Sequence, residues 1–247
     1  LRGEPPLRPP QAAHSSIISG PIARSSALMV SDFRFPGFTP DDFGLFQIRD
    51  RARRREEILR QIHPKLAAMS EDILSDFRRR GIEGLHPHLP QLNWPPGYQP
   101  FCTWLALSSQ AHRYQDLAQL NVGVHEPFVA VRLGFDTSGF AFGRLLFLIS
   151  HGDLKETLER IAVPSGLRCR VYRSVPWPEG SRAIFDSGED FLKGAQVAER
   201  EGAHWFEIGK VFTRAHSDVL LSRPEFSATA AQILLTLYPA FRRLAGP

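Results

Sequence analysis

The stretch Phe101–Asp136, FCTWLALSSQAHRYQDLAQLNVGVHEPFVAVRLGFD, decides the fold of this chain. It contains three apolar runs, residues 101–107, 120–124 and 128–135, which are joined by two short polar breaks. Aromatic and aliphatic residues dominate these runs, as is typical of half-buried strands. Strands that follow one another through short turns pair antiparallel, so the stretch predicts a three-stranded meander.

Period-two alternation in the second and third runs assigns their side chains to two faces of the predicted sheet. One face receives Leu120, Val122, Val124, Val129, Val131 and Leu133, and the other receives Asn121, Gly123 and Arg132. The turn between these runs is His125-Glu126-Pro127, because Pro127 fixes its own φ and favours an extended residue before it. We expect His125 and Glu126 to be a solvent-exposed pair there, rather than an acid–base pair.

Two more strands are predicted further along the chain. Residues 167–174 alternate and are closed by prolines, and residues 204–214 form a fifth apolar strand. Helical patterns separate these strands from one another. The sequence therefore predicts an α+β fold, in which helices cover a central antiparallel sheet of about five strands in a two-layer sandwich.

Helix signals flank the predicted strands. Thr39 as N-cap and Asp42 as the reciprocal cap residue, with a proline between them, predict a short first helix. A helix over residues 49–61 is expected to break at Pro64, and another to continue over residues 64–80. Further helices are expected over residues 151–161, 187–201 and 227–244, whereas residues 140–148 suit either a helix or a strand.

The first 28 residues differ in composition from the rest. Four prolines crowd residues 5–10, five serines follow, and Glu4 is the only acid. We expect residues 1–28 to be a disordered extension, or upstream residues with Met29 as the natural start; an organelle transit peptide is the alternative. Residues 29–247 are expected to form a single α+β domain.

Composition restricts the class of protein. No apolar run reaches the roughly 18 residues that a membrane span needs, so no membrane partner is expected. The net charge is +4 over 247 residues, a positive balance that suits a phosphate-bearing partner, either nucleic acid or a phosphorylated small molecule. Cys102 and Cys169 lie in predicted strands without a CxxC motif, which favours buried thiols and a cytoplasmic location.

The chain carries no catalytic signature. It has no GxSxG, Walker phosphate loop, HExxH or glycine pattern for dinucleotides, and we expect no cofactor. His86 and His88 flank a proline and would project from one side of an extended segment. A third ligand at a telling spacing is missing, so no metal site is expected.

Two groups of polar residues are candidates for ligand binding. His112, Arg113 and Tyr114 lie in the connection between two central strands, where a rigid sheet could present them to a ligand. Lys210 and Arg214 are four residues apart on the fifth strand and therefore share a face. This second pair suits either an anion site or the protection of an edge strand.

Short motifs follow one another in a fixed order from about residue 33 onward. They are Phe38-Thr39-Pro40-Asp41-Asp42-Phe43, Phe46, Ile62-His63-Pro64-Lys65, Pro87-His88, Thr103-Trp104-Leu105-Ala106, Tyr114, Gly123, Phe206-Glu207-Ile208-Gly209-Lys210, Arg214 and Leu237-Tyr238. In order and spacing they resemble the YktB-like family of bacterial proteins of unknown function. The resemblance implies an α+β fold with a central antiparallel sheet, and no established activity.

The chain departs from the family pattern at several basic positions. After its Pro-His motif the family tends to carry Lys, His and Arg, where this chain has Gln91, Leu92, Trp94 and Pro95. Residues 112–115 and 118–120 also lack several of the family's basic and imidazole groups. The resemblance thus implies an anion site that is weakened or repurposed here. The candidate residues that keep the pattern are His88, Trp104, Tyr114, Lys210 and Arg214.

We favour a binding module as the function. In this hypothesis a sheet face with Arg113, Tyr114, Lys210 and Arg214 binds an anionic ligand, which is a nucleic acid or a phosphorylated metabolite. Aromatic rings beside basic groups suit stacked bases.

Two alternatives stay open. The first is an enzyme with a pocket between residues 84–100 and the sheet, in which His88 or His112 is a general base and Tyr114 donates a hydrogen bond. No activated nucleophile or paired carboxylate in the sequence supports it. The second alternative is a protein-interaction subunit.

Overall fold

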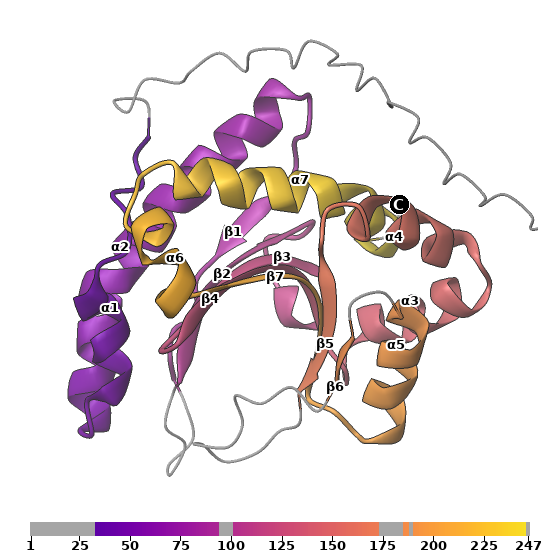
Figure 1. The fold of residues 1–247 in the computed structure, drawn as a ribbon, viewed down its shortest axis with the longest axis horizontal. Helices are drawn as coiled ribbons and strands as arrows, with labels where there is room; N and C mark the ends of the chain where they lie inside the picture. Colours follow the sequence, from indigo (N-terminus) through magenta and orange to yellow (C-terminus); the bar gives the residue numbers. More distant parts are fainter. Residues whose placement is uncertain (1–32, 94–100, 173–184, 188–189, 246–247) are drawn as a thin grey trace, which may run out of the picture.

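The computed structural model describes residues 33–93, 101–172, 185–187 and 190–245, and a sheet of seven strands lies at their centre (Figure 1). The strands are β1 (His86–His88), β2 (Cys102–Ser108), β3 (Gln119–His125), β4 (Phe128–Asp136), β5 (Arg168–Tyr172), β6 (Phe185–Ser187) and β7 (Trp205–Thr213). They lie in the order β1-β2-β3-β4-β7-β5-β6, and every neighbouring pair is antiparallel.

The predicted α+β fold is confirmed. The expected meander is β2, β3 and β4, and the two later strands are β5 and β7. The sheet is wider than expected because β1 and β6, each three residues long, extend its two edges. Strands this short carry no period-two signal, so the sequence pattern could not show them. The predicted extension, residues 1–28, lies outside the described residues.

Seven α-helices accompany the strands in the described ranges. They are α1 (Pro40–Gly44), α2 (Arg51–Arg79), α3 (Phe140–Ser150), α4 (Asp153–Ala162), α5 (Phe191–Arg200), α6 (Arg214–Leu221) and α7 (Phe226–Ala245). Short 3-10 helices, η2 (Leu45–Gln47) and η3 (Tyr114–Asp116), complete the order. None of the helices described combines the length and the apolar character that a membrane crossing requires.

The expected break at Pro64 is wrong, because α2 continues through this proline as one helix of 29 residues. Its buried apolar stripe continues on both sides of the proline and consists of Ile58, Ile62, Leu66, Met69, Ile73 and Phe77. A proline removes one backbone donor from a helix, at a cost of about 3 kcal/mol. Packing of the stripe on the sheet and α7 offsets that loss.

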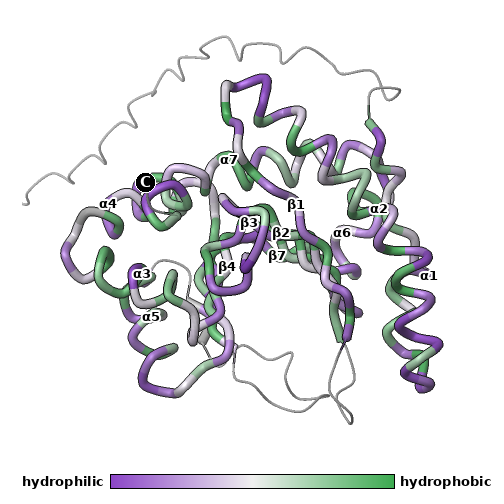
Figure 2. The backbone as a smooth tube through the Cα atoms, turned by 180° about the vertical axis from the view of Figure 1, so that it is seen from behind, coloured by the Kyte–Doolittle hydropathy of each residue, from purple (hydrophilic) through white to green (hydrophobic). Residues whose placement is uncertain are grey.

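The described helices lie on one side of the sheet, whose strands curve away from them (Figure 1, and from behind in Figure 2). α7 packs across β3 and β4, α2 packs on β2, and α5 packs on β5 and β7. One cluster of buried apolar side chains extends from Phe35 to Leu244 and fills the space between the two layers. We refer to this side of the sheet as the helix-covered face.

The predicted capping box at the start of α1 is present and ties two helices together. The backbone N–H of Thr39 donates to Oδ2 of Asp42 at 2.6 Å, and the hydroxyl of Thr39 lies 3.1 Å from the same oxygen. Nζ of Lys65 on α2 also contacts this oxygen at 2.5 Å. Asp42 is buried, so the opening motif of the family resemblance has a structural role here.

Candidate functional site

The face of the sheet opposite the helices carries buried polar side chains. Strand register places Asn121 beside Arg132, Arg132 beside Gly209, and Arg168 beyond Gly209. Residues at every second position from these share their face. We call this side the polar face, and its principal members are His88, Trp104, Gln119, Asn121, Gly123, His125, Arg132, Arg170, Tyr172, Trp205 and Glu207.

Arg132 is the centre of the polar face. Its Nη1 forms an ion pair with Oε2 of Glu207, and its Nε donates to Oδ1 of Asn121 at 3.1 Å. The guanidinium carbon lies 5.2 Å from the centre of the Trp205 ring, in a cation–π contact. Only 6% of Arg132 is exposed, so the sheet holds a charged group away from water.

Glu207 accepts contacts from three strands while its side chain is fully buried. The indole Nε1–H of Trp205 donates to Oε2 at 3.0 Å, and the hydroxyl of Tyr172 donates to Oε1 at 3.2 Å. Burial and the neighbouring carboxylate raise the pKa of Tyr172, so its hydroxyl keeps its proton and remains a donor. Glu207 therefore fixes the positions of Arg132 and Tyr172.

Arg170 brings a second buried guanidinium to the polar face. It is 9% exposed, and its Nη1 lies 3.9 Å from Oε1 of Glu207, too far for a hydrogen bond. That buried nitrogen has no hydrogen-bond partner among the described residues. Its Nε lies 3.5 Å from Asp186, which Arg168 contacts at 2.9 Å. Two buried arginines thus share one buried acid, and the half-exposed Asp186 is divided between Arg168 and Arg170.

His125 is buried, which corrects the expectation of a solvent-exposed pair. It is the last residue of β3, its ring stacks on Phe128 with centroids 4.3 Å apart, and both ring nitrogens lack a partner in the described part of the chain. Burial, followed by the charge of Arg132, lowers the pKa of His125 well below its ordinary 6.5. Glu126 points elsewhere and accepts a hydrogen bond from Gln47.

His88 and Tyr114 meet near the β1 edge of the polar face. Their rings stack with centroids 4.3 Å apart, and Nε2 of His88 lies 3.0 Å from both the Ser108 hydroxyl and the Gln110 carbonyl. The side chain of Trp104 hydrogen-bonds to Tyr114, whose pKa burial raises.

Gln119 and Asn121 connect this edge to the centre. The amide of Gln119 donates to the Tyr114 carbonyl at 3.3 Å, and the amide of Asn121 donates to Gln119 at 3.4 Å. Asn121 in turn accepts from Arg132, so polar contacts cross the sheet from β1 to β5. Within the described residues, no three His, Cys, Asp or Glu side chains are close enough to hold a metal ion.

The structure separates the candidate residues into two groups. His88, Trp104 and Tyr114 lie together at the polar face, whereas Arg113 is exposed in the connection with a φ of 55°. The expectation that one sheet face joins Tyr114 to Lys210 is wrong.

Lys210 pairs with Val131, and that register puts it on the helix-covered face, at an exposed position. Arg214 begins α6, and its guanidinium lies 4.9 Å from the Phe43 ring. The two basic residues are therefore close to the helices and not to the buried arginines. Whether they bind an anion stays a prediction.

Three central residues of the polar face were not among the binding candidates chosen from the sequence, namely His125, Arg170 and Glu207. The alternation that assigned Asn121 and Gly123 to one face would have included His125 if the strand had been extended by one residue beyond 124. Period-two alternation on β7 likewise places Glu207 on the same face as Trp205. Nothing local in the sequence shows that β7 lies between β4 and β5, and this order is what brings Arg132, Glu207 and Arg170 together.

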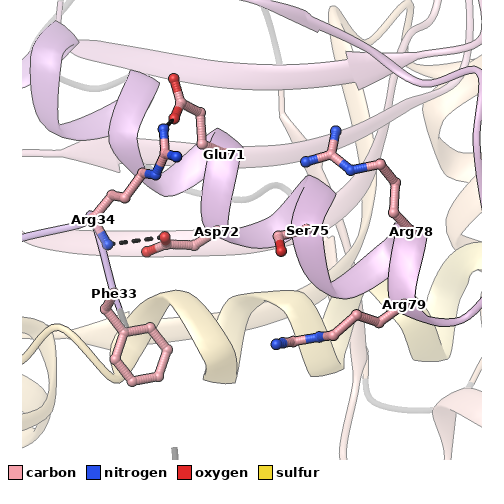
Figure 3. A pocket seen from close by; sticks show the side chains of 7 residues that line it. All are labelled: Phe33, Arg34, Glu71, Asp72, Ser75, Arg78 and Arg79. Carbon is pink, nitrogen blue, oxygen red and sulfur yellow. Dashed lines mark hydrogen bonds and ion pairs between the residues drawn. The ribbon is translucent and has the colours of Figure 1, made fainter. Parts of the chain in front are cut away.

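A separate pocket of about 460 Å³ lies beside α2 (Figure 3). Its lining residues are Phe33, Arg34, Glu71, Asp72, Ser75, Arg78 and Arg79. Arg34 already forms an ion pair with Glu71, and its backbone N–H donates to Asp72 at 2.9 Å. Arg34 and Glu71 are exposed and already pair with each other, so the pocket is a weaker candidate than the polar face.

Comparison with known proteins supports the family resemblance. Residues 38–138 match the family described as Domain of unknown function (DUF1054). The chain is 29% identical over 97 residues to the UPF0637 protein OB1420 of Oceanobacillus iheyensis, and YktB-like proteins are the UPF0637 family. The resemblance to this bacterial family of unknown function is confirmed. The alignment covers 39% of this chain and 47% of the relative, so the chain spans about half the length of the curated relative it matches.

The matched range contains only part of the polar face. Arg132, His125 and Asn121 lie within residues 38–138, as do the residues of the His88–Tyr114 stack. Arg170 and Glu207 come from strands beyond the matched range. The family match thus covers the β1–β4 half of the polar face and leaves the acid that pairs with Arg132 outside.

Proposed function

We propose that this protein is a binding module for a small anionic ligand, which binds on the polar face around Arg132 and Arg170. The observation that carries the proposal is Nη1 of Arg170, a buried cationic donor without a hydrogen-bond acceptor among the described residues. An oxyanion of the ligand would supply that acceptor. Three arginines (Arg132, Arg168 and Arg170) face two acids (Glu207 and Asp186) here, which leaves one positive charge for it.

The energetics favour a functional reason for this arrangement. A buried polar group without a hydrogen bond costs roughly 1–3 kcal/mol, and charged groups cost more. The helix-covered face already supplies an apolar core, so the protein does not need buried arginines in order to fold. Buried, incompletely paired charges on a sheet face are therefore better explained by a ligand than by stability.

The burial of the arginines favours a small ligand over a nucleic acid. Proteins that bind single strands without sequence preference use exposed basic groups along a groove, with salt-sensitive affinity. Arg132 and Arg170 are 6% and 9% exposed, which suits one or two oxyanions better than a long phosphate backbone. A phosphorylated or carboxylated metabolite thus suits the polar face best.

Tryptophan fluorescence provides the test, because Trp104 and Trp205 both lie on the polar face. The protein is titrated with acetate, inorganic phosphate, a nucleoside monophosphate and a short single-stranded RNA. We expect saturable quenching by at least one small anion. The variant Arg170→Gln should weaken the binding by about tenfold or more, which corresponds to the loss of one charge-assisted hydrogen bond.

The matched control is the double variant Lys210→Ala/Arg214→Ala, which removes two positive charges near the helices. It should bind the small anion as the unchanged protein does. The opposite pattern, with full affinity in Arg170→Gln and lost affinity in the double variant, would move the anion site to Lys210 and Arg214. Tight RNA binding that is lost at high salt would show that the ligand is a polyanion and not a small molecule.

The stacked His88–Tyr114 pair supports an enzyme as the second candidate function. Nε2 of His88 is directed at two oxygens, so it carries the proton and leaves Nδ1 as a possible base. Burial, the largest cause, lowers the pKa of His88, which keeps the ring neutral near pH 7. If a bound ligand is turned over, His88→Gln should abolish turnover while binding persists; unchanged turnover in this variant would exclude His88 as the base.

A further inference from the structure

Two polar atoms converge over Gly123, in the middle of β3. A Cβ built at this glycine would lie 2.6 Å from Nη2 of Arg132 and 3.2 Å from Nε2 of His125. The Arg132 guanidinium therefore already occupies the space that a side chain at residue 123 would take, and the glycine lets it lie directly over β3 beside His125. Nη1 and Nε of Arg132 are engaged by Glu207 and Asn121, which leaves Nη2 as the part of the guanidinium directed at this position.

His125 is a second, independent indication of a ligand. It is 7% exposed, and neither ring nitrogen has a hydrogen-bond partner among the described residues. A buried imidazole normally finds at least one partner, since an unmade hydrogen bond is costly. Phe128 stacks on one side of the ring, so the nitrogen near Gly123 is positioned by packing and not by a hydrogen bond.

We infer that Nη2 of Arg132 and Nε2 of His125 form a subsite over Gly123 for the carboxylate of a planar aromatic acid. This inference rests on the proposed function and specifies one ligand class for it. Two converging N–H groups provide the donors that a carboxylate accepts from. The absence of a side chain at residue 123 lets the guanidinium come this close to β3 and brings Nη2 beside His125.

The surroundings of the subsite favour an aromatic carboxylate over a phosphate. Trp104 lies directly opposite Gly123 on β2, and Ala130 lies opposite it on β4, so a ring would rest between an indole and a small residue. The charge of Arg132 is already matched by Glu207. A single negative charge is therefore easier to accommodate here than the double charge of a phosphate monoester.

Binding at this subsite should couple to protonation of His125. The charged and titratable groups that face His125 are Arg132 from β4 and Cys102, its partner on β2. Burial raises the pKa of Cys102 to about 12, so this thiol is uncharged near neutral pH. A carboxylate beside the ring would favour the imidazolium, so benzoate should bind more tightly as the pH falls below 6.5 toward the lowered pKa of His125 in the free protein.

The test uses benzoate as the probe, with cyclohexanecarboxylate as a non-planar control of equal charge and inorganic phosphate as a second control. NMR follows the ring nitrogens of His125, assigned with the variant His125→Gln, while fluorescence gives the affinity. We expect benzoate to shift the His125 resonances and to bind better than both controls. Gly123→Ala should weaken benzoate binding by about tenfold or more, because the methyl group would displace Nη2 of Arg132 from its place beside His125.

Gly143→Ala is the matched glycine control, since nothing lies within 4 Å of a Cβ there. The atoms nearest to a Cβ at residue 123 belong to the side chains of Arg132 and His125 and not to the backbone, so we expect Gly123→Ala to fold, and urea denaturation checks this. Suppose that binding depends on Arg170, but benzoate does not shift the His125 resonances and Gly123→Ala binds it with full affinity. This outcome would overturn the subsite and keep the proposed function. If none of the three anions binds the unchanged protein, the subsite and the proposed function are both wrong.

Discussion

Val131 and Arg132 are consecutive residues of β4, yet they lie in opposite chemical environments. Val131 points to the helix-covered face and is fully buried among apolar side chains. Arg132 points to the polar face, where its partners are a carboxylate, an amide and an indole. Both positions are withdrawn from water, so burial alone does not distinguish the two faces of the sheet.

The two faces differ in what their burial achieves. On the helix-covered face, burial of apolar area stabilises the fold directly. On the polar face, burial of Arg132, Glu207 and Arg170 costs desolvation that their mutual contacts only partly return, since Nη1 of Arg170 lacks an acceptor among the described residues. We interpret the first face as the source of stability and the second as the place of function.

The largest effect is expected when Glu207 is replaced by alanine. The substitution leaves Arg132 and Arg170 buried without their shared acid, and breaking a buried ion pair in this way costs about 3–5 kcal/mol. Urea denaturation would measure the loss in the free energy of unfolding. Asp186→Ala is the control on the same face and should lose far less, because the Asp186 side chain is 45% exposed. Equal losses in both variants would contradict the central position of Glu207.

A substitution on the other face should be costly for a different reason. Leu133 is fully buried in the apolar core. Leu133→Ala therefore removes apolar contacts and leaves a cavity, which should lower the free energy of unfolding by about 3 kcal/mol. Val219→Ala on α6 is the control, since Val219 is 67% exposed. Denaturation curves should shift strongly for the first variant and little for the second. Ligand affinity per folded molecule should not change in either, and a selective loss in Leu133→Ala would weaken the division between the faces.

The pH dependence of stability should reveal His63 on the helix-covered face. Its Nε2 lies 2.8 Å from the Thr103 hydroxyl, and burial lowers the pKa of His63 to about 4. Below the ordinary pKa of 6.5 the unfolded chain takes up a proton that the folded protein does not. Stability should therefore fall between pH 6.5 and 4, by at most about 1.4 kcal/mol per pH unit for this group.

Urea midpoints measured across this pH range provide the check. In His63→Gln the free energy of unfolding should change less steeply with pH. The part of this pH dependence that comes from His125, which burial also keeps neutral, should remain. An anion bound at the polar face should change the part of the pH dependence that comes from His125. The part that comes from His63 should stay the same. The same slope in His63→Gln and in the unchanged protein would show that His63 is not the group that titrates.

The smallest effect concerns the capping box of α1. Asp42→Ala removes the acceptor for the backbone of Thr39 and for Lys65, and loss of such a cap typically costs about 1–2 kcal/mol. Thermal unfolding would detect it. Because Asp42 lies with the helices, ligand binding at the polar face should be unaffected. A large loss of binding would mean that the opening motif belongs to the site.

Local patterns in the sequence predicted much of this fold for physical reasons. The alternation over residues 120–135 separated Arg132, Asn121 and Gly123 from the valines, because side chains on a strand alternate between its faces. Thr39 and Asp42 indicated the start of α1 through a contact that is local along the chain.

The site itself depends on contacts that are distant in sequence. Arg132 and Glu207 are 75 residues apart, and only the placement of β7 between β4 and β5 joins them. His125 looked like a turn residue because Pro127 follows, whereas β3 extends to His125 and buries it. Proline usually interrupts a helix, but tertiary packing keeps α2 continuous through Pro64.

An NMR titration that follows the arginine Nε–Hε resonances tests the division between the two faces most directly. Benzoate is added to the unchanged protein, and Arg132 and Arg170 on the polar face are compared with Arg214 beside α6. We predict saturable shifts for Arg132 and Arg170 and none for Arg214. Shifts of Arg214 with Arg132 and Arg170 unmoved would contradict the account and place the anion beside the helices.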